Sequence, residues 1–348
     1  MKPRVLLVAA LCAVALLPRA AAAQPGLLLG VDDDSLKWYA HTSSLLSIYR
    51  SLDLDAVRVT LRWTPGESFP VGTDRTELQR AANAGRAIRV VLAVTGPEAS
   101  PPLDPAARTS YCGFVANVLA RYPAIHDVAI WTEPNSKRFW QPQRGAAAAY
   151  EALLATCWDT LHAAAPGVNV IATSAPHARP GDWYRAMGKA YKASARALPI
   201  FDTVGHNAYP ETSAEPPAAT HKKRSLDEGD LPRLLKVLHA AFAGTGQRDV
   251  SIWYLEDGFQ STEPYTGIET DKKPVSEAQQ AAQLTAAIEL AYCQPAVGAF
   301  FNFELRDDSD LGGWQSGLVR PDWTAKPAFA AYVQAARAVH DGAIVCPS

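Results

Sequence analysis

The sequence lacks several features that would assign it to common classes of protein. After the first 23 residues, no apolar run is long enough to cross a bilayer as a helix, so an integral membrane protein is not expected. No internal repeat of roughly 20 to 50 residues and no low-complexity tail is present, which argues against a repeat array. The formal net charge is −2, so the chain also lacks the basic surplus that binds nucleic acid non-specifically.

The first 23 residues have the pattern of a secretory signal peptide. Lys2 and Arg4 form a positive start, residues 5–17 are apolar, and residues 21–23 are small enough for a cleavage site. We therefore expect residues 24–348 to form the mature chain, and we expect it to be secreted, with no membrane anchor. The signal carries three cations and no acid, so its removal changes the net charge to −5.

Cysteine is scarce, and its count is informative. Of the five cysteines, one lies in the signal, and an even number in a secreted chain predicts two disulfides. Three pairings are possible, with free buried thiols as the alternative. We favour Cys112–Cys157 and Cys293–Cys346, because these residues fall on successive outer elements of the predicted fold. No spacing resembles a zinc site, and we expect no metal and no other cofactor.

The chain does have a regular alternation of strand-like and helix-like runs. Eight short runs rich in β-branched or aromatic residues predict strands at residues 27–31, 56–63, 88–94, 128–131, 168–173, 201–209, 250–256 and 297–303. Each is followed by a helix-like run, at residues 35–51, 74–84, 105–121, 145–165, 181–197, 231–243, 276–292 and 327–340. Strict alternation predicts a parallel sheet, and eight units are the number that closes a single (β/α)8 TIM barrel.

An open, doubly wound α/β sheet is the structural alternative. Such a sheet usually carries a glycine-rich phosphate loop after its first strand. Here residues 30–34 read Gly-Val-Asp-Asp-Asp, which is acidic and would repel phosphate. The sequence therefore favours the barrel.

Two glutamates stand where predicted strands end. Glu133 follows the fourth strand in Trp-Thr-Glu-Pro-Asn, and Glu256 ends the seventh in Trp-Tyr-Leu-Glu-Asp-Gly. The carboxyl ends of barrel strands form the face where such folds carry out their chemistry. The fourth and seventh strands lie on opposing sides of this mouth, so the two carboxyl groups can face each other. Two facing carboxyl groups are the equipment for cleaving a glycosidic bond.

These motifs resemble the glycoside hydrolases of clan A, and they are most similar to its family 39 and family 5 branches. Residues 131–135 look like the clan's Trp-Asn-Glu-Pro-Asn segment, and residues 255–259 look like its strand-seven segment. The resemblance implies that Glu133 is the acid/base and Glu256 the nucleophile. Residues 317–322 with 326–328 are similar to the clan's Gly-Leu-Val…Lys-Pro-Ala entry to the last helix.

Three further positions take their expected roles from the same resemblance. Arg58 corresponds to the clan's arginine beside the nucleophile, and His206 and Tyr209 correspond to its strand-six segment, whose tyrosine bonds the nucleophile. The chain departs from the pattern at two places. Thr132 replaces the asparagine that usually bonds the sugar's 2-hydroxyl, and Asp257 replaces an aromatic residue. Because strand neighbours face opposite sides, we expect little coupling between Asp257 and the nucleophile.

Other residues near strand ends are candidates for supporting the site. We expect Asn135 mainly to hold its turn. Aromatic faces stack on the apolar face of sugar rings, and we expect about two of five such residues to line the cleft: Trp63, Trp140, Trp183, Phe303 and Trp314.

The sequence thus predicts a secreted retaining glycoside hydrolase that acts on an extracellular or cell-wall polysaccharide or oligosaccharide. A transglycosylase with the same residues is one alternative, and a non-catalytic glycan-binding barrel is the other. The sequence does not indicate the sugar, the linkage or the oligomeric state.

Overall fold

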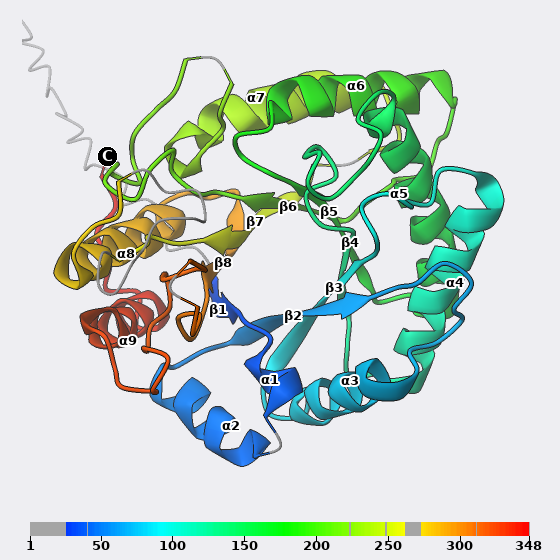
Figure 1. Cartoon of the computed structure of the whole chain (residues 1–348). Coiled ribbons are helices and arrows are strands. Elements are labelled where there is room, and N and C mark those ends of the chain that lie inside the picture. The colour runs from blue at the N-terminus through cyan, green and yellow to red at the C-terminus, as the bar shows by residue number, and fades with distance from the viewer. Residues whose placement is uncertain are drawn as a thin grey trace, which may run out of the picture.

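Eight parallel strands close into one barrel (Figure 1). The computed structural model describes residues 26–39, 41–222, 224–247, 249–261, 273–310 and 312–347. Each strand pairs with the next, and the last pairs with the first. The strands are β1 (Leu28–Asp32), β2 (Ala56–Arg62), β3 (Arg89–Thr95), β4 (Asp127–Ile130), β5 (Asn169–Ser174), β6 (Thr203–Asn207), β7 (Ser251–Asp257) and β8 (Val297–Phe303). The predicted (β/α)8 barrel is confirmed.

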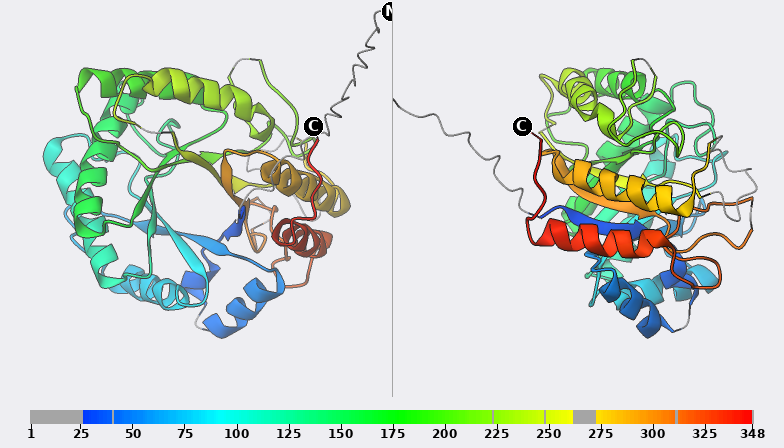
Figure 2. Two further views of the ribbon diagram at one scale, coloured as in Figure 1. Left: turned by 180° about the vertical axis from the view of Figure 1, so that it is seen from behind. Right: turned by 90° about the vertical axis from the view of Figure 1, so that its left-hand side faces the viewer.

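Helices surround the barrel and cover the outer faces of its strands (Figure 2). They are α1 (Ser35–Trp38), α2 (Thr42–Ser51), α3 (Gly72–Ala84), α4 (Pro105–Arg121), α5 (Ala146–Ala164), α6 (Pro180–Ala193), α7 (Leu231–Phe242), α8 (Glu277–Tyr292) and α9 (Pro327–His340), with a short 3₁₀ turn η1 (Glu228–Asp230) before α7. Several begin with the expected signals. Asp104 caps α4, and Ser276 with Gln279 forms a capping box on α8.

One predicted helix is wrong in its extent. The sequence suggested a single helix over residues 35–51, whereas the structure has the two helices α1 and α2. Tyr39 adopts an extended backbone (φ −89°, ψ 126°), which ends α1 after one turn. Its ring packs edge-on against Trp323 of the β8–α9 connection, at 5.3 Å between centroids. A tertiary aromatic contact thus accompanies the break in a locally helical pattern.

The core has two layers. Most buried apolar side chains lie between the strands and the helices. A smaller cluster fills the barrel interior: Ala56, Val91, Ala93, Ala129, Ile171, Trp253, Leu255, Ala299 and Phe301. Alternate strand positions supply this cluster, as expected for side chains that point to opposite faces of a strand.

A bulge near the end of β7 changes which residues face the barrel axis. Trp253 and Leu255 point inward, so strict alternation would send Asp257 inward and Glu256 outward. The register against both neighbouring strands shifts after Tyr254, and Glu256 lies opposite Asn207 of β6. Bulges re-aim side chains in this way near active sites. Glu256 therefore reaches the mouth of the barrel, and Asp257 is buried behind it.

Both predicted disulfides are confirmed. Cys112 of α4 bonds to Cys157 of α5, and Cys293 after α8 bonds to Cys346 in the C-terminal segment. The first joins neighbouring outer helices, and the second ties the chain end to the barrel.

The predicted signal peptide, with the cleavage site before Gln24, lies outside the described residues. Among the described helices, none combines the length and the apolar character that a membrane crossing requires.

Removing either disulfide should lower the free energy of unfolding by about 2–4 kcal/mol, because the bridges close chain segments of 45 and 53 residues in the unfolded state. The Cys112→Ala/Cys157→Ala variant should lose more than Cys293→Ala/Cys346→Ala. Its sulfur atoms are fully buried, so packing is lost as well. Urea unfolding measures both. If the Cys112→Ala/Cys157→Ala variant were as stable as the wild type, the stabilising role of this disulfide would be contradicted.

Candidate active site

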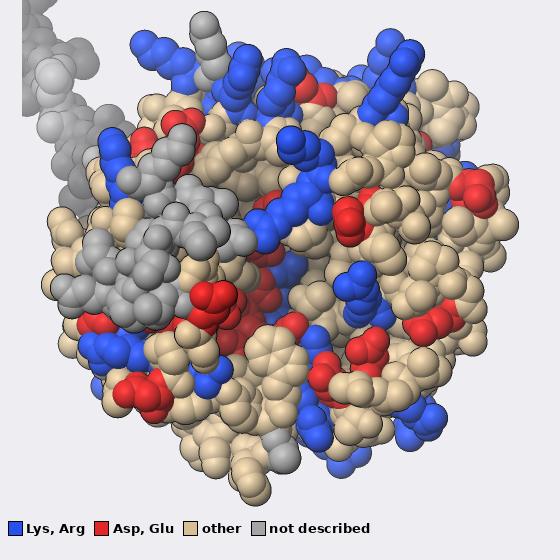
Figure 3. Space-filling model, viewed as in Figure 1, with Lys and Arg blue, Asp and Glu red and all other residues tan. Residues whose placement is uncertain are grey.

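A cleft of about 720 Å³ opens at the carboxyl ends of the strands. The space-filling view shows a hollow at the centre of this face, with acidic and basic side chains inside it (Figure 3). Polar and charged side chains provide much of its lining, notably Asp32, Arg58, Arg62, Glu98, Thr132, Glu133, Arg138, His177, Tyr209, Glu211 and Glu256. Ligand sites of parallel barrels form at this face, so the cleft is the candidate active site.

Two donors hold Glu256, one from β2 and one from the connection after β6. The Arg58 guanidinium of β2 donates to Oε1 at 2.8 Å, and the Tyr209 hydroxyl donates to Oε2 at 3.2 Å. Arg58 is 3% exposed and also pairs with Asp32 of β1. A neighbouring cation and a hydroxyl donor both favour the ionised form of a carboxyl group. Burial and then the charge of Glu256 raise the pKa of Tyr209 well above its usual value, so its hydroxyl stays a donor.

Glu133 lies in an environment that disfavours the ionised form of its carboxyl group. Burial, followed by the negative charge of Glu256, raises the pKa of Glu133 to about 7. The Asn207 amide donates to Glu133 Oε1 at 2.8 Å and partly offsets this rise. Two carboxyl groups in one cleft whose environments differ in this way have the properties of a proton donor and an anion.

The Glu133 turn is strained and is braced by buried aromatic rings. Trp131 (φ 64°) and Glu133 (φ 37°) both have left-handed backbone conformations, which non-glycine residues rarely adopt. The Trp131 indole donates to Phe139 O at 2.7 Å, and its backbone N–H donates to the Tyr111 hydroxyl at 3.2 Å. The surroundings therefore fix a backbone shape that the local sequence does not favour.

Two predicted sugar-stacking residues belong to this brace and do not line the cleft. Trp140 is fully buried and packs edge-on against Trp131 at 5.3 Å between centroids. Trp63 is 1% exposed and packs edge-on against Tyr111, also at 5.3 Å. Trp183 is buried as well. Trp63 and Trp140 were two of the five candidates for lining the cleft. They lie in the outer core instead, where they pack behind the Glu133 segment.

Phe303 and Trp314, two of the five candidates, do line the cleft. Trp314 stacks on Tyr209 at 5.7 Å between centroids, with an interplanar angle of 26°. Phe303 meets Trp314 edge-on at 5.1 Å. The three rings form an apolar wall beside Glu256.

His206, expected to bind substrate or to support the site, does not line the cleft. Its ring is fully buried, and burial lowers its pKa to about 4, which keeps the imidazole neutral. The ring nitrogens are paired with Ser174 Oγ and with Leu226 O. His206 faces outward because its strand neighbour Asn207 faces inward, toward Glu133.

The other two predicted residues flank Glu133. Thr132 lines the cleft. Asn135 is 7% exposed and exchanges hydrogen bonds with the backbone of Ala175, at 2.8 and 3.0 Å. As expected, Asn135 holds its turn, here by tying it to the β5–α6 connection.

Sequence reasoning missed several cleft residues. Asp32 ends β1, and the same signal that selected the glutamates, a carboxyl group at a strand's end, would have found it. Asn207 carried no such signal, because its inward orientation depends on the register of β6. His177 and Glu98 lie on connecting loops, where the sequence pattern does not predict which way a side chain points.

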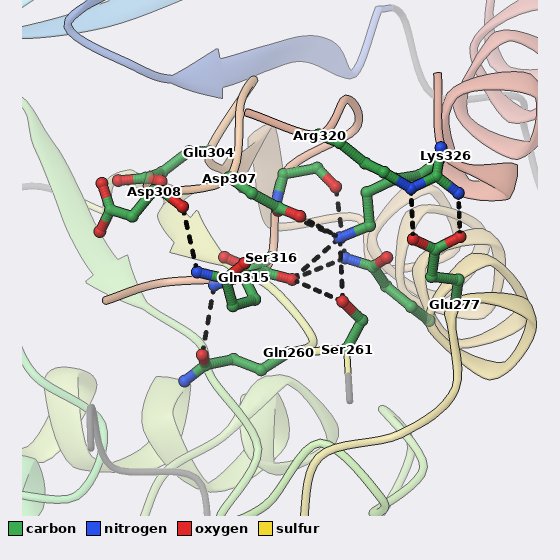
Figure 4. Close-up of polar contacts among 12 residues, drawn as sticks. Gln260, Ser261, Glu277, Glu304, Asp307, Asp308, Gln315, Ser316, Arg320 and Lys326 are labelled. Atoms are coloured by element: carbon green, nitrogen blue, oxygen red, sulfur yellow. Dashed lines mark hydrogen bonds and ion pairs between the residues drawn. The ribbon is translucent and has the colours of Figure 1, made fainter. Parts of the chain in front are cut away.

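A buried polar network fixes the β8–α9 connection that carries Trp314 (Figure 4). The Lys326 ammonium, fully buried, donates to both oxygens of Asp307 at 3.0 Å, to Gln315 O at 3.0 Å and to Ser261 Oγ at 3.2 Å. The Trp314 backbone N–H donates to Asp308 Oδ2 at 2.9 Å. The network thus joins the connections after β7 and β8 and places Trp314 against the cleft.

Comparison with models of protein families finds no match, and neither does comparison with curated protein sequences. Solved structures do match. A GH2 β-galacturonidase from Eisenbergiella tayi aligns with 12% identity and a TM-score of 0.57, covering 86% of this chain and 47% of its own. A GH5_18 protein from Bifidobacterium longum subsp. infantis aligns with 16% identity and a TM-score of 0.62, covering 89% and 78%.

A fungal β-1,4-galactanase also aligns, with 13% identity and a TM-score of 0.62, over 88% of this chain and 99% of its own. This chain spans about half the length of the β-galacturonidase. At such identities the likeness establishes the fold. The expected resemblance is confirmed at the level of the barrel fold, and the assignment to family 39 or family 5 stays a prediction.

Replacing Lys326 with methionine should lower the free energy of unfolding by about 3–5 kcal/mol, because Asp307 is then left buried without a cation. Lys326→Met/Asp307→Leu should recover much of this loss. Arg185→Met removes an ion pair with Asp182 in which both side chains are more than half exposed, and it should change stability by less than about 1 kcal/mol. Urea unfolding compares the three. If Lys326→Met lowered the free energy of unfolding as little as Arg185→Met does, the stabilising role of the buried Lys326–Asp307 pair would be contradicted.

Proposed function

We propose that this protein is a secreted retaining glycoside hydrolase. Glu133 is the acid/base, Glu256 is the nucleophile, and the substrate is an extracellular or cell-wall polysaccharide or oligosaccharide. One observation carries the proposal: two carboxyl groups share a cleft, one held by a cation and a hydroxyl donor and the other with its pKa raised to about 7. This division of roles is what double displacement requires.

In the first step, a Glu256 oxygen attacks the anomeric carbon and forms a glycosyl ester while the glycosidic C–O bond breaks. Glu133 transfers its proton to the departing oxygen, which leaves as an alcohol. Arg58 and Tyr209 hold the attacking carboxylate in place through their hydrogen bonds to its two oxygens. Phe303 and Trp314 supply the apolar wall on which a sugar ring can stack.

In the second step, water attacks the anomeric carbon and the ester bond breaks. Esterification has removed the negative charge of Glu256, and that charge contributes to the raised pKa of Glu133. The pKa of Glu133 therefore falls, so Glu133 accepts the proton of the water as general base. Two displacements at one carbon return the original anomeric configuration.

The disulfides and the N-terminal sequence pattern support secretion. The lining of the cleft mixes aromatic rings with groups of both charges, which suits a polyhydroxylated ligand. The replacement of asparagine by Thr132 at the position beside the acid/base leaves the sugar itself open.

A panel of plant, fungal and bacterial-wall polysaccharides tests the activity and finds a substrate. On that substrate, Glu256→Ala should reduce turnover by at least several orders of magnitude, and azide should partly restore it. Azide then attacks the anomeric carbon once, so the glycosyl azide should have inverted configuration. In Glu133→Ala, azide replaces water in the second step, so the azide product should retain configuration.

Glu289→Ala removes an exposed carboxyl group on α8, far from the cleft, and should keep full activity. Near-wild-type turnover by Glu256→Ala would contradict the assignment of the nucleophile. Products larger than the starting oligosaccharide would identify transglycosylation, and binding without product release would identify a glycan-binding barrel.

The pH dependence should follow Glu133. Because this residue must be protonated in the first step, kcat/KM should fall as the pH rises through about 7. The Asn207 amide stabilises the ionised form of Glu133, so Asn207→Ala should raise the pKa and move the alkaline limb to higher pH. The measurement is the pH at which kcat/KM falls on the alkaline side, and not the maximum value of kcat/KM. If Asn207→Ala left this pH unchanged or moved it to a lower value, the role of Glu133 would be contradicted.

A further inference from the structure

Two buried carboxyl groups behind Glu256 have oxygens that lack a hydrogen-bond donor. Glu228 of η1 is 1% exposed, and Asp257 of β7 is fully buried. Neither oxygen of Glu228 accepts a hydrogen bond from a described residue, and nor does Oδ2 of Asp257. The other Asp257 oxygen accepts from the Gly258 backbone N–H at 2.7 Å. Buried polar atoms normally have partners, so these three oxygens require a physical explanation.

One proton between the two groups supplies the missing donor. Both side chains line the same small cavity, which has no room for a water molecule, and they lie within hydrogen-bonding reach of each other. Two ionised carboxylates repel, whereas a protonated carboxyl group donates its O–H to a carboxylate oxygen. A proton on Glu228 therefore gives a partner to Asp257 Oδ2 and replaces a repulsion by a hydrogen bond.

The charges around the pair oppose a second negative charge. The ionisable groups that surround it come from the β5–α6 and β6–α7 connections, η1, α7 and β7: His177, Tyr209, Glu215, His221, Asp227, Asp230, Arg233, Tyr254 and Glu256. From α8 the pair meets the backbone of Ala291.

The basic groups in this set already face other acids. His177 lies 3.2 Å from Asp227, and Arg233 lies 2.9 Å from Asp230. The imidazole of His221 lies between Glu215 and these two aspartates. Among the described residues, these contacts leave no surplus of positive charge for the buried pair.

The pKa values of the pair have the direction that this arrangement requires, and burial is the main cause that raises both. The charge of Asp257 and the hydrogen bond to it raise the pKa of Glu228 further, to well above its usual value. Burial raises the pKa of Asp257 to about 7, against the lowering effect of its hydrogen bonds with Gly258 and Glu228. Coupled groups titrate as one unit, so the pair keeps one proton somewhat above pH 7.

We propose that Glu228 and Asp257 share one proton at mildly alkaline pH, and that the resulting hydrogen bond positions the nucleophile Glu256 and its partner Tyr209. Carboxyl groups too close for both to ionise hold a proton in this way in aspartic proteases. Asp257 stands where the clan pattern has an aromatic residue, and the pair gives this departure a role. The positioning role rests on the function proposed above, whereas the shared proton does not.

The pair connects the two segments that hold the attacking carboxylate. Glu228 N–H donates to Ala208 O at 3.3 Å, and Ala208 N–H donates to Glu256 O at 2.8 Å. Tyr209, which donates to Glu256, directly follows Ala208, and Asp257 directly follows Glu256. The shared proton therefore fastens η1, and with it the connection that carries Tyr209, to the end of β7.

The number of protons that the full chain takes up on folding tests the shared proton. Glu228→Gln keeps the shape of the side chain, and its amide can donate to Asp257 without an added proton. At about pH 8 an unfolded glutamate, with its ordinary pKa of 4.5, is ionised. The wild type should then take up about one more proton on folding than this variant. Stability that depends on a raised pKa is lost as the pH rises toward that pKa. Urea unfolding at several pH values around this one should therefore show a steeper fall in the free energy of unfolding for the wild type.

Asp257→Asn removes the charge that holds the proton on Glu228, so it should also reduce proton uptake. Asp127→Asn is the matched control. Asp127 is 1% exposed and accepts hydrogen bonds from the Arg89 guanidinium at 2.7 Å and the Asn169 amide at 2.9 Å, so it needs no proton. The control should leave proton uptake unchanged. Equal uptake by the wild type and Glu228→Gln, or wild-type uptake by Asp257→Asn, would overturn the proposal.

Kinetics on the substrate found with the polysaccharide panel test the positioning role. Glu228→Leu leaves Asp257 Oδ2 without a donor and should lower kcat by about 10- to 100-fold with little change in KM, because a small displacement of a reacting group is costly in rate. Glu228→Gln should restore most of this loss. Wild-type kcat in Glu228→Leu, or an equal loss in Glu228→Gln, would overturn the positioning role. Proton uptake is measured without substrate, so its outcome is independent of the proposed activity.

Discussion

The placement of two carboxyl groups in one buried cleft is the constraint on which the rest of this structure depends. Like charges in a region of low dielectric repel strongly, so both groups cannot stay ionised without compensation. The protein surrounds the two carboxyl groups with different neighbours. Arg58 and Tyr209 bind Glu256, while burial and the neighbouring charge raise the pKa of Glu133. The difference between the two groups is therefore a property of their neighbours, because the side chains themselves are identical.

Such an arrangement requires rigid support, and much of the surrounding architecture provides it. The aromatic rings behind Trp131 hold a turn whose backbone conformation is unfavourable, and the bulge in β7 aims Glu256 at the barrel mouth. On the opposite side, the buried pair of Lys326 and Asp307 fixes the loop that carries Trp314. Groups that must keep a functional geometry within a fraction of an ångström need supports of this kind.

The structural comparisons illustrate how little the fold alone determines. Barrels of this shape occur in proteins described as a β-galacturonidase and a β-1,4-galactanase, at 12% and 13% identity. The scaffold is shared, and specificity resides in the loops and side chains grafted on it. In this chain, Thr132 beside Glu133 and the loop residues His177 and Glu98 line the cleft.

The sequence by itself determined the features that depend on local pattern. Alternating strand-like and helix-like runs indicated eight units and hence a barrel, and strand-end position selected Glu133 and Glu256. Tertiary structure decided what periodicity cannot express. The register of β6 turned Asn207 inward and His206 outward, and the bulge in β7 did the equivalent for Glu256 and Asp257. Packing placed Trp63 and Trp140 in the core, while Phe303 and Trp314 reached the cleft. The physical reason is that a side chain's direction depends on strand register and on neighbours distant in sequence, whereas its membership of a strand or helix depends mostly on residues nearby.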